Sequence, residues 1–290
     1  MSKAIAHRIR GNVCVRVRSG PRWVVSRPLP DVNPPFEWRT EDWGPALVCR
    51  ALEDVAPHMF TTRQLALTEP AGWTALASSA GVAPDRLLRL TQTHSARVEV
   101  VARAEPRSTW TAPDADALVS DDPTVVLAVR VADCAPILLA DRRTGAVGAV
   151  HAGWRGTAAG IAPAAVQAMA ASFGTRPDDL MAVIGPNIGT CCYDVGPELV
   201  DAFATHRHAR HLIDRWFLAR PPRRGETDVP PLRLDVAGAN RDQLVLAGVP
   251  ESQVYVSGLC TASHLDVFTS FRAEREKAGR MAAIIRPAIR

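Results

Sequence analysis

The stretch Val125-Val-Leu-Ala-Val-Arg-Val131, followed by Ala-Asp-Cys-Ala-Pro and Ile137-Leu-Leu-Ala140, gives the clearest indication of the fold class. Both apolar runs are continuous, which is typical of β-strands covered on both faces. A third buried strand is predicted at 146–150, and it runs into His151, a glycine-containing turn and an alanine-rich amphipathic helix. Because short β-branched runs and helical segments keep alternating from residue 46 onward, the sequence predicts an α/β (α+β) protein with one principal domain.

Residues 1–43 differ in character from the rest of the chain. They contain two strand-like stretches, at 12–18 and 23–26, and then a proline-rich stretch at 27–35. Proline-rich segments interrupt secondary structure and connect folded parts. We therefore expect an accessory N-terminal hairpin and linker at 1–43 and a catalytic domain at 44–290.

The composition excludes several classes of protein. The chain has 290 residues, 47% of them apolar, and 34 basic against 30 acidic side chains, so it lacks the electrostatic footprint of nucleic-acid binding. No run reaches the roughly 18 apolar residues that span a bilayer, and the N-terminus has no apolar signal core. The six cysteines are too sparse and irregular for a disulfide scaffold. We expect a cytoplasmic protein with reduced thiols and no membrane or nucleic-acid partner.

Three side chains stand where an apolar run meets a turn of small residues: His94, Cys134 and His151. Strand ends of this kind deliver side chains to a cleft in α/β proteins. Two imidazoles and one thiolate are a complete protein ligand set for catalytic zinc, which keeps its fourth position for water. Zinc fingers instead take their ligands in close pairs, whereas these three are far apart along the chain. The sequence thus predicts a catalytic Zn²⁺ site that lowers the pKa of its water to about 7.

Polar side chains stand beside each candidate ligand, namely Gln92, Asp133 and Arg155. Asp133 would orient a ligand or act as a general base, although strand alternation could also turn it away from Cys134. The turn from Gly153 to Thr157 opens a helix, and its free N–H groups, positive dipole end and guanidinium predict a pocket for phosphate or an oxyanion. Glycines that merely allow tight packing are the alternative explanation.

Each candidate also has an ordinary structural interpretation. A single cysteine after a buried strand is usually a core residue, and a single histidine is usually a satisfied core or surface residue. Cys134 and a histidine could also form a metal-free nucleophile, which metal analysis and chelators would distinguish. The stretch 206–211, with three histidines among arginines, predicts a solvated helix face, and Cys191-Cys192 predicts a packed loop that could line the pocket.

Taken together, these motifs resemble the laccase-domain family, also called YfiH-like or polyphenol-oxidase-like proteins. They follow the family's order over about residues 46–287, and the pair of stretches around Cys134 and His151 is specific. The matching stretches are Gln92-Thr-His94-Ser, Ala115-Asp-Ala-Leu-Val, Ala132-Asp-Cys134-Ala-Pro-Ile, His151-Ala-Gly-Trp-Arg-Gly, Ile184-Gly-Pro-Asn-Ile-Gly-Thr-Cys-Cys-Tyr-Asp-Val-Gly, Ser257-Gly-Leu-Cys-Thr and Gly279-Arg-Met-Ala. Three further residues match family positions: Arg63, Asn240 and Arg280.

The resemblance implies mixed β-sheets flanked by helices in a layered sandwich. It also implies phosphorolysis of purine nucleosides (adenosine, inosine or methylthioadenosine), deamination of adenosine, and a monomer or small homo-oligomer. The implied zinc ligands are His94, Cys134 and His151. Catalysis is assigned to Asp133, Arg155 and Cys134. Binding of phosphate and nucleoside is assigned to Gly153, Arg155 and Arg63.

Two features of the chain bear on what the family name implies. Copper oxidation of phenols needs several coppers on repeated His-x-His pairs, and this chain has eight histidines and a single such pair, so copper is less expected than zinc. Family members usually carry a Gly-Gly-Val-Ser loop after the equivalent of Arg63, whereas this chain has a different stretch at 64–73. If that loop shapes the nucleoside pocket, substrate preference changes while the metal triad is unaffected.

Two rival functions remain open at this point. One is a peptidoglycan editing hydrolase, a role also attached to this family, which would release amino acids from cell-wall precursors. The other is a zinc-bound interaction module that has lost activity together with its loop. Zinc bound at one equivalent without turnover of any nucleoside would favour the module.

Overall fold

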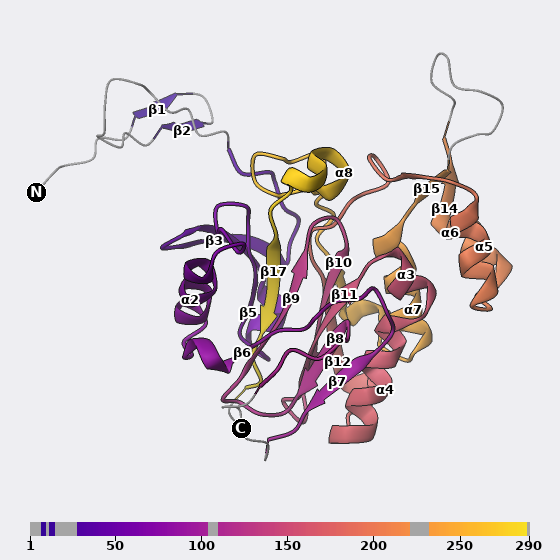
Figure 1. Cartoon of the computed structure of the whole chain (residues 1–290), viewed down its shortest axis with the longest axis horizontal. Coiled ribbons are helices and arrows are strands. Elements are labelled where there is room, and N and C mark those ends of the chain that lie inside the picture. The colour runs from indigo at the N-terminus through magenta and orange to yellow at the C-terminus, as the bar shows by residue number, and fades with distance from the viewer. Residues whose placement is uncertain (1–6, 10–11, 15–27, 104–109, 221–231, 289–290) are drawn as a thin grey trace, which may run out of the picture. The chain divides into compact units, whose positions relative to one another are not determined.

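The computed structural model describes residues 7–9, 12–14, 28–103, 110–220 and 232–288 (Figure 1). The chain divides into two compact units, residues 1–31 and 32–290. The first unit contains a short antiparallel hairpin of β1 (His7–Ile9) and β2 (Asn12–Cys14). The strand predicted from residue 12 is therefore present, and the one predicted at 23–26 lies outside the described residues.

Two six-stranded mixed sheets form the centre of the second unit. The first has the strand order β16-β12-β10-β11-β8-β7, in which the two outermost pairs are parallel and the inner pairs antiparallel. Its strands are β7 (Val98–Val101), β8 (Ala117–Ser120), β10 (Ala135–Asp141), β11 (Val147–Ala152), β12 (Leu180–Ile184) and β16 (Val254–Val256).

The second sheet has the strand order β3-β4-β5-β17-β9-β6, and only its β6–β9 pair is parallel among the described residues. Its strands are β3 (Phe36–Glu41), β4 (Gly44–Cys49), β5 (His58–Phe60), β6 (Leu87–Leu88), β9 (Val126–Val131) and β17 (Met281–Ile285). β3 pairs along its whole length with β4, so residues 36–41 belong to this sheet although the sequence placed them in the accessory segment. The boundary between the units falls after residue 31 instead of residue 43.

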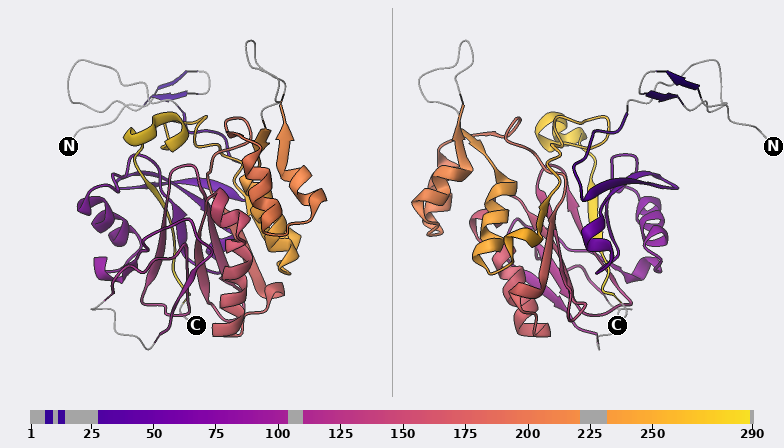
Figure 2. Two further views of the ribbon diagram at one scale, coloured as in Figure 1. Left: turned by 45° about the vertical axis from the view of Figure 1, so that its right-hand side comes forward. Right: turned by 180° about the vertical axis from the view of Figure 1, so that it is seen from behind.

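Helices cover the outer faces of the two sheets, which pack against each other through β9 and β17 on one side and β10 and β11 on the other (Figure 2). The first sheet carries α3 (Trp154–Ala158), α4 (Ile161–Phe173) and α7 (Val236–Leu246), and the second carries α2 (Pro70–Ser79). This arrangement confirms the predicted layers of mixed sheets flanked by helices. No helix in the described ranges is both long and apolar enough to cross a membrane.

The remaining elements are short and lie at the edges of these layers. The helices are α1 (Arg50–Glu53), α5 (Glu198–Thr205), α6 (Arg210–Trp216) and α8 (Phe271–Glu274), and a small third sheet contains β13 (Asp194–Val195), β14 (Phe217–Ala219) and β15 (Leu232–Leu234). Single turns of 3₁₀ helix lie at Pro84–Arg86, Pro177–Asp179, Glu251–Gln253 and Arg275–Lys277.

Burial along the central strands explains why they read as continuous apolar runs. Every residue of β10 and β11 is buried, and in β9 only Arg130 is partly exposed. The long helix predicted after His151 is interrupted at Gly160, whose φ of +80° lies in the left-handed region that favours glycine. This turn separates α3 from α4, and so lets the first turn of helix stay beside the end of β11.

The histidine-rich stretch 206–211 connects two helices instead of forming one solvated face. His206 and His211 are exposed, but the Nε2 atom of His208 lies 2.7 Å from the backbone oxygen of Ala158, and its ring packs against Trp216. The prediction of a solvated helix face is therefore wrong for His208. Its ring helps to fix α3, the helix that follows His151.

Candidate metal centre

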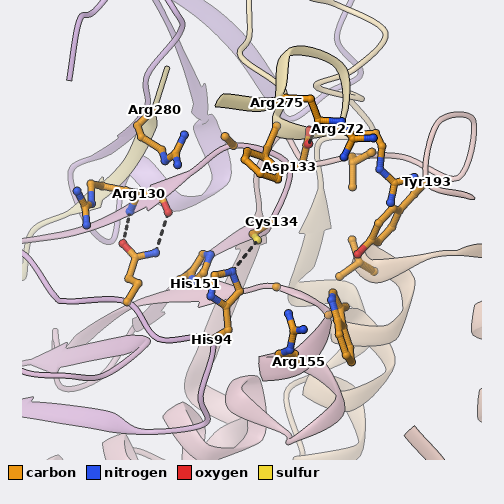
Figure 3. A pocket seen from close by; sticks show the side chains of 17 residues that line it. His94, Arg130, Asp133, Cys134, His151, Arg155, Tyr193, Arg272, Arg275 and Arg280 are labelled. Atoms are coloured by element: carbon orange, nitrogen blue, oxygen red, sulfur yellow. Dashed lines mark hydrogen bonds between the residues drawn. The ribbon is translucent and has the colours of Figure 1, made fainter. Parts of the chain in front are cut away.

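The three predicted ligands come from separate parts of the chain and meet at one point (Figure 3). His94 lies in the loop before β7, Cys134 in the turn between β9 and β10, and His151 near the end of β11. Their ligand atoms all lie within 4.8 Å of one another, and His94 Nε2 is 3.9 Å from Cys134 Sγ. His151 is buried, Cys134 is half-buried and His94 is exposed, so an ion could reach the group from the side of His94.

The spacing and chemistry of these atoms fit a tetrahedral divalent ion. With bonds of about 2.3 Å to sulfur and about 2.0 Å to nitrogen, two ligands of a tetrahedral zinc are about 3.3–3.6 Å apart. Donor atoms within 4.8 Å of one another reach that separation with small side-chain rotations. Two imidazoles and one thiolate also leave a fourth position free, as in catalytic zinc sites.

A buried carboxylate organises both histidines. Asp116 is fully buried, and its Oδ1 accepts hydrogen bonds from His151 Nδ1 at 2.8 Å and from the backbone N–H of His94 at 3.0 Å. Its Oδ2 accepts from the N–H and hydroxyl of Ser95, at 2.6 and 2.7 Å, and from those of Thr93. Because Nδ1 of His151 is held in this way, Nε2 is the nitrogen left to bind an ion.

The sequence analysis gave Asp116 no role. Its one signal was its position in the matching stretch Ala115-Asp-Ala-Leu-Val, where a carboxylate interrupts an apolar run. A fully buried carboxylate must be hydrogen-bonded or paired to be stable. Its partners come from 21 to 35 residues away along the chain, and only the folded structure identifies them.

Asp133, the carboxylate that the sequence did single out, shapes the turn that presents Cys134. Its φ of +87° lies in the left-handed region, which is unfavourable for a residue other than glycine. Its carboxylate accepts hydrogen bonds from the hydroxyl of Thr261 and the backbone N–H of Arg272, both at 2.6 Å. Asp116 thus orients the histidines, while Asp133 holds the strained turn next to the sulfur.

The charges of the group favour a thiolate beside an imidazolium. Burial alone would raise the pKa of the Cys134 thiol, but the charge of His151 and hydrogen bonds from both histidines outweigh it and lower the pKa to about 6. Burial alone would lower the pKa of His151, but the Cys134 thiolate and Asp116 raise it to about 9. Despite burial, the same histidine and Ser95 hold the pKa of Asp116 below its usual range. At neutral pH the sulfur is deprotonated, which is the form that binds metal.

Gly153 allows the start of α3 to approach the ligands. A Cβ atom at this position would lie 2.9 Å from Cys134 Sγ and 2.9 Å from His94 Cδ2, closer than real Cβ contacts. A side chain here would therefore displace a ligand. These contacts favour the packing explanation for Gly153 over a direct role in binding phosphate.

The triad opens into a cavity of 570 Å³ with a positively charged wall. The guanidinium groups that line it belong to Arg130, Arg155, Arg272, Arg275 and Arg280, and the aromatic rings to Trp154, Tyr193 and Phe271. Within the described ranges, none of these five arginines forms an ion pair with a carboxylate. Cations that have no carboxylate partner in a cavity create a binding site for anions.

The arginines approach the cavity from different sides of the triad. In Figure 3, Arg130 and Arg280 lie on one side of Cys134, Arg272 and Arg275 on another, and Arg155 on the side of His94. Burial and the nearby charges of Arg89 and Arg280 lower the pKa of Arg130. A bound anion would relieve this repulsion, so the wall is arranged to attract negative charge.

Two contacts fix where these arginines sit. The side-chain amide of Gln92 forms two 2.8 Å hydrogen bonds with the backbone of Arg130, one to its oxygen and one from its N–H. The guanidinium of Arg155 lies 4.3 Å from the centre of the Trp154 ring, which is within the range of a cation–π contact. Gln92, which is near His94 in the sequence, therefore fixes the backbone at the end of β9 that carries Arg130.

Two other predicted residues lie outside the cavity lining. Arg63 donates to backbone oxygens of the segment before α8 and pairs with Glu274 at 3.0 Å, so it anchors that segment. Asn240 is buried in α7 and donates to the hydroxyl of Thr157 at 2.9 Å, which connects α7 to α3. Both residues support the elements around the cavity and do not line it.

The stretch 64–73, which departs from the family pattern, also lies away from the cavity. Leu65 and Leu67 are buried with Leu76 of α2 against strands β9 and β17. None of the described residues that line the cavity comes from 64–73. The unusual stretch therefore shapes the outer helical layer of the second sheet.

Comparisons with known proteins give related sequences and folds. A family model described as multi-copper polyphenol oxidoreductase laccase matches residues 71–288. The chain is similar to a purine nucleoside phosphorylase of Deinococcus radiodurans (38% identical over 210 residues, 72% of this chain and 74% of that protein). It is also similar to adenosine deaminase RL5 of an unknown prokaryotic organism (36% over 211 residues, 71% of this chain and 76% of that protein). The crystal structure of the hypothetical protein YfiH of Bacillus licheniformis superimposes with a TM-score of 0.76 at 29% identity, covering 87% of this chain and 99% of that one.

Proposed function

Because the chain belongs to the laccase-domain family, we propose that it is a zinc-dependent purine nucleoside phosphorylase that also deaminates adenosine. The observation that carries this proposal is the wall of five arginines in the same cavity as the His94–Cys134–His151 triad. A phosphorylase needs a site for phosphate, and arginines bind phosphate through two parallel hydrogen bonds. The cavity volume of 570 Å³ also lies within the range of small-molecule sites.

Zinc is the ion that we assign to the triad. When bound, it supplies Lewis-acid chemistry by polarising an oxygen of water or substrate. A blue-copper centre uses the same two histidines and cysteine but adds a weak axial ligand, most often methionine. No methionine is among the described residues that line the cavity, and the Gln92 amide is bound to the backbone of Arg130. The donor set therefore favours zinc over copper.

In phosphorolysis the bond between C1′ of the ribose and N9 of the purine breaks, and a phosphate oxygen bonds to C1′. We assign Arg155 to orienting the phosphate, with Arg130 and Arg280 neutralising its charge from the facing side of the cavity. The flat rings of Trp154 and Tyr193 offer stacking surfaces for the purine. Burial raises the pKa of Tyr193 to about 12, so its hydroxyl keeps its proton and can donate a hydrogen bond to a ring nitrogen.

Deamination of adenosine replaces the amino group at C6 with the oxygen of water and releases ammonia. It needs the triad and a purine site but no phosphate, so the arginines are not required for this reaction. Cys134 serves both reactions as a ligand, and Asp133 serves them by positioning it. The requirement for phosphate therefore separates the two activities of one cavity.

The test is to incubate the purified zinc-loaded protein with adenosine, with and without phosphate, and to separate the products by chromatography. We expect adenine and ribose 1-phosphate only when phosphate is present, and inosine with or without it. Inosine with phosphate should yield hypoxanthine. A zinc-loaded protein that converts neither nucleoside contradicts the proposal, and release of amino acids from peptidoglycan precursors would favour the rival hydrolase.

The state of the cysteines bears on where this reaction takes place. The side chains of Cys49, Cys134, Cys191, Cys192 and Cys260 are free thiols, and Cys191 is exposed. Thiols remain reduced in the cytosol. We therefore assign the activity to the cytoplasm.

A further inference from the structure

A second group of metal-binding side chains lies outside the cavity lining. The sulfur atoms of Cys191, Cys192 and Cys260 all lie within 4.8 Å of one another. Cys191 and Cys192 belong to the loop between β12 and β13, and Cys260 follows β16, so two separate segments bring the sulfurs together. We call these three residues the thiol cluster.

The backbone around the thiol cluster is built for close approach. The N–H of Gly189 donates to Cys260 Sγ at 3.2 Å, and a Cβ at Gly189 would lie 3.2 Å from Cys260 Cβ and 3.4 Å from Cys191 Sγ. Asn187 forms a parallel bridge with Cys260, and the N–H of Thr261 donates to the backbone oxygen of Asn187 at 3.0 Å. These bonds clamp the two segments together, so the spacing of the sulfurs is set by the fold.

The cluster is open on one side and closed on the other. Cys191 is exposed, Cys192 is half-buried, and Cys260 is only 6% exposed. The hydroxyl of Ser263 lies 3.3 Å from the sulfur of Cys191 and 3.3 Å from that of Cys192. An ion could therefore arrive through Cys191 and be held against the interior by Cys260.

We propose that Cys191, Cys192 and Cys260 form a second metal site, which binds one Cu(I) ion through three thiolates. Soft thiolate ligands select soft ions, Cu(I) and zinc among them. A structural zinc takes four ligands from cysteine, histidine or carboxylate, whereas the described residues supply only three such groups here. Cu(I) is satisfied by two or three thiolates, so it matches both the number and the softness of the donors.

A disulfide is a poorer match for the same three residues. Adjacent cysteines such as Cys191 and Cys192 seldom bridge without strain. A bond from either one to Cys260 would leave the third sulfur beside it unused. Three sulfurs within 4.8 Å of one another can instead supply all the ligands of a three-coordinate ion.

Occupation of this site would act on the cavity through the loop that carries the cysteines. Ile188 and Tyr193 stand on either side of Cys191 and Cys192, and both line the cavity. The N–H of Tyr193 donates to the backbone oxygen of Gly189 at 3.0 Å, so the turn is tight. Cu(I) would fix the loop and, with it, the position of the Tyr193 ring.

The first test measures copper binding in the full-length reduced protein. The triad also offers a thiolate, so the titration is done in the Cys134→Ala variant, without oxygen and against a coloured Cu(I) chelator. We expect one Cu(I) per chain, bound tightly enough to compete with the chelator. X-ray absorption at the copper edge should show sulfur ligands only.

The second test uses variants within that background. Adding Cys192→Ser should weaken Cu(I) binding at least 100-fold, while adding Cys49→Ala should leave it unchanged, because Cys49 is buried in β4 and lies outside the cluster. Thermal unfolding and circular dichroism check that each variant is folded. If Cys192→Ser does not fold, Cys191→Ser at the exposed position provides the same comparison.

Three results would overturn the proposal. One is a folded Cys134→Ala protein that takes up no Cu(I). Another is copper bound with nitrogen ligands, or bound equally well after replacement of Cys192. The third is formation of a disulfide within the cluster when oxidised glutathione is supplied together with Cu(I): the glutathione disulfide takes up the two electrons and two protons, and the protein loses two hydrogens in the intact mass.

Discussion

The metal triad and the thiol cluster are two groups of three ligands that the fold supports in different ways. The triad rests on strand ends of the central sheets, and a buried carboxylate, Asp116, holds its two histidines. The thiol cluster rests on two loops, and the hydroxyl of Ser263 lies 3.3 Å from two of its sulfurs. A charged, fully buried support fixes ligand orientation more strongly than a neutral one near the surface. We therefore expect an ion bound at the triad to dissociate more slowly than one bound at the cluster.

The two groups also differ in electrostatic surroundings. The triad opens into a cavity lined by five arginines, whereas none of the three cysteines of the cluster is among the described residues that line it. Only the triad therefore adjoins a wall of arginines, which is why we propose that the substrate and phosphate bind beside the triad and not beside the cluster. Substitutions at either group, and at the residues that support it, test whether the two groups differ in this way.

The largest effect is expected from Cys134→Ala. It removes the sulfur ligand from the triad, so both adenine and inosine formation should fall at least about 1,000-fold, because the ion is required in both reactions. Turnover and zinc content of the purified variant are the measurements. Cys49→Ala, which also removes a thiol from the second unit, should retain both. Retained activity in a folded Cys134→Ala protein would show that the triad is not the reaction centre.

A smaller loss is expected from Asp116→Asn. Asparagine lacks the charge that holds His151 and the backbone of His94, so zinc affinity should fall about 10–100-fold, as for other residues that orient metal ligands. Competition with a zinc chelator measures this affinity. Asp141→Asn serves as the control, because Asp141 is equally buried and accepts hydrogen bonds from nearby N–H groups, but lies at the far end of β10. Equal zinc affinities in the two variants would remove the proposed distinction between the two groups.

A still smaller effect is expected from Arg130→Gln, and it should be confined to phosphorolysis. The KM for phosphate should rise about 10-fold, the effect of losing one charged hydrogen bond, while deamination without phosphate should change less than about threefold. Steady-state kinetics of both reactions measure the split. Arg89→Gln is the control, since Arg89 stands near Arg130 but lies over the ring of Trp73, outside the cavity lining. Parallel losses in both reactions would show that Arg130 acts on the fold or the purine instead.

The smallest effect is expected on stability, through His58. Its ring accepts the N–H of Cys49 and donates to the backbone oxygen of Ala56, both at 3.0 Å, and burial lowers its pKa to about 4. On acidification, the imidazole of His58 is therefore protonated at a higher pH in the unfolded chain than in the folded one. Through this group the free energy of unfolding should fall as the pH decreases from about 6.5 to about 4, and it should not change above about pH 6.5. The loss is at most about 3 kcal/mol.

Urea unfolding at several pH values, compared between the protein and His58→Gln, isolates this contribution. Glutamine can keep one acceptor and one donor but does not titrate, so the variant should become more stable relative to the unchanged protein as the pH falls from about 6.5 to about 4. Both metal groups belong to the same unit, so they should lose their ions together when it unfolds. If the difference in unfolding free energy between the two proteins does not change with pH, His58 is not the group that causes the loss of stability in acid.

The three ligands of the triad could be predicted from the sequence, but the residues that support them could not. His94, Cys134 and His151 were recognisable because each follows an apolar run, and this pattern is local. The role of Asp116 was not, because its partners are remote in sequence and meet only in the fold. Asp133 was recognised as important by its position, but its task became evident only from its contacts with Thr261 and Arg272.

The same limit applies to the arginines and the thiol cluster. Arg272 and Arg275 come from the last part of the chain, where nothing local indicates that they line a cavity with Arg155, and Arg280 was marked only by its match to a family position. Cys260 meets Cys191 and Cys192 because β16 pairs in parallel with β12, a pairing that a single sequence does not specify. Local periodicity predicted the layers and most central strands, but not which loops adjoin at the strand ends.

The strained turn at Asp133 joins the two groups physically. Its carboxylate accepts from Thr261, next to Cys260, and its backbone oxygen accepts the N–H of Ile188 at 2.9 Å, while Cys134 follows it directly. Any shift that one ion imposes on this turn is therefore transmitted toward the other. Thermodynamic linkage requires such communication to be reciprocal: if copper alters the zinc affinity by some factor, zinc alters the copper affinity by the same factor. Supply of one metal would then regulate retention of the other.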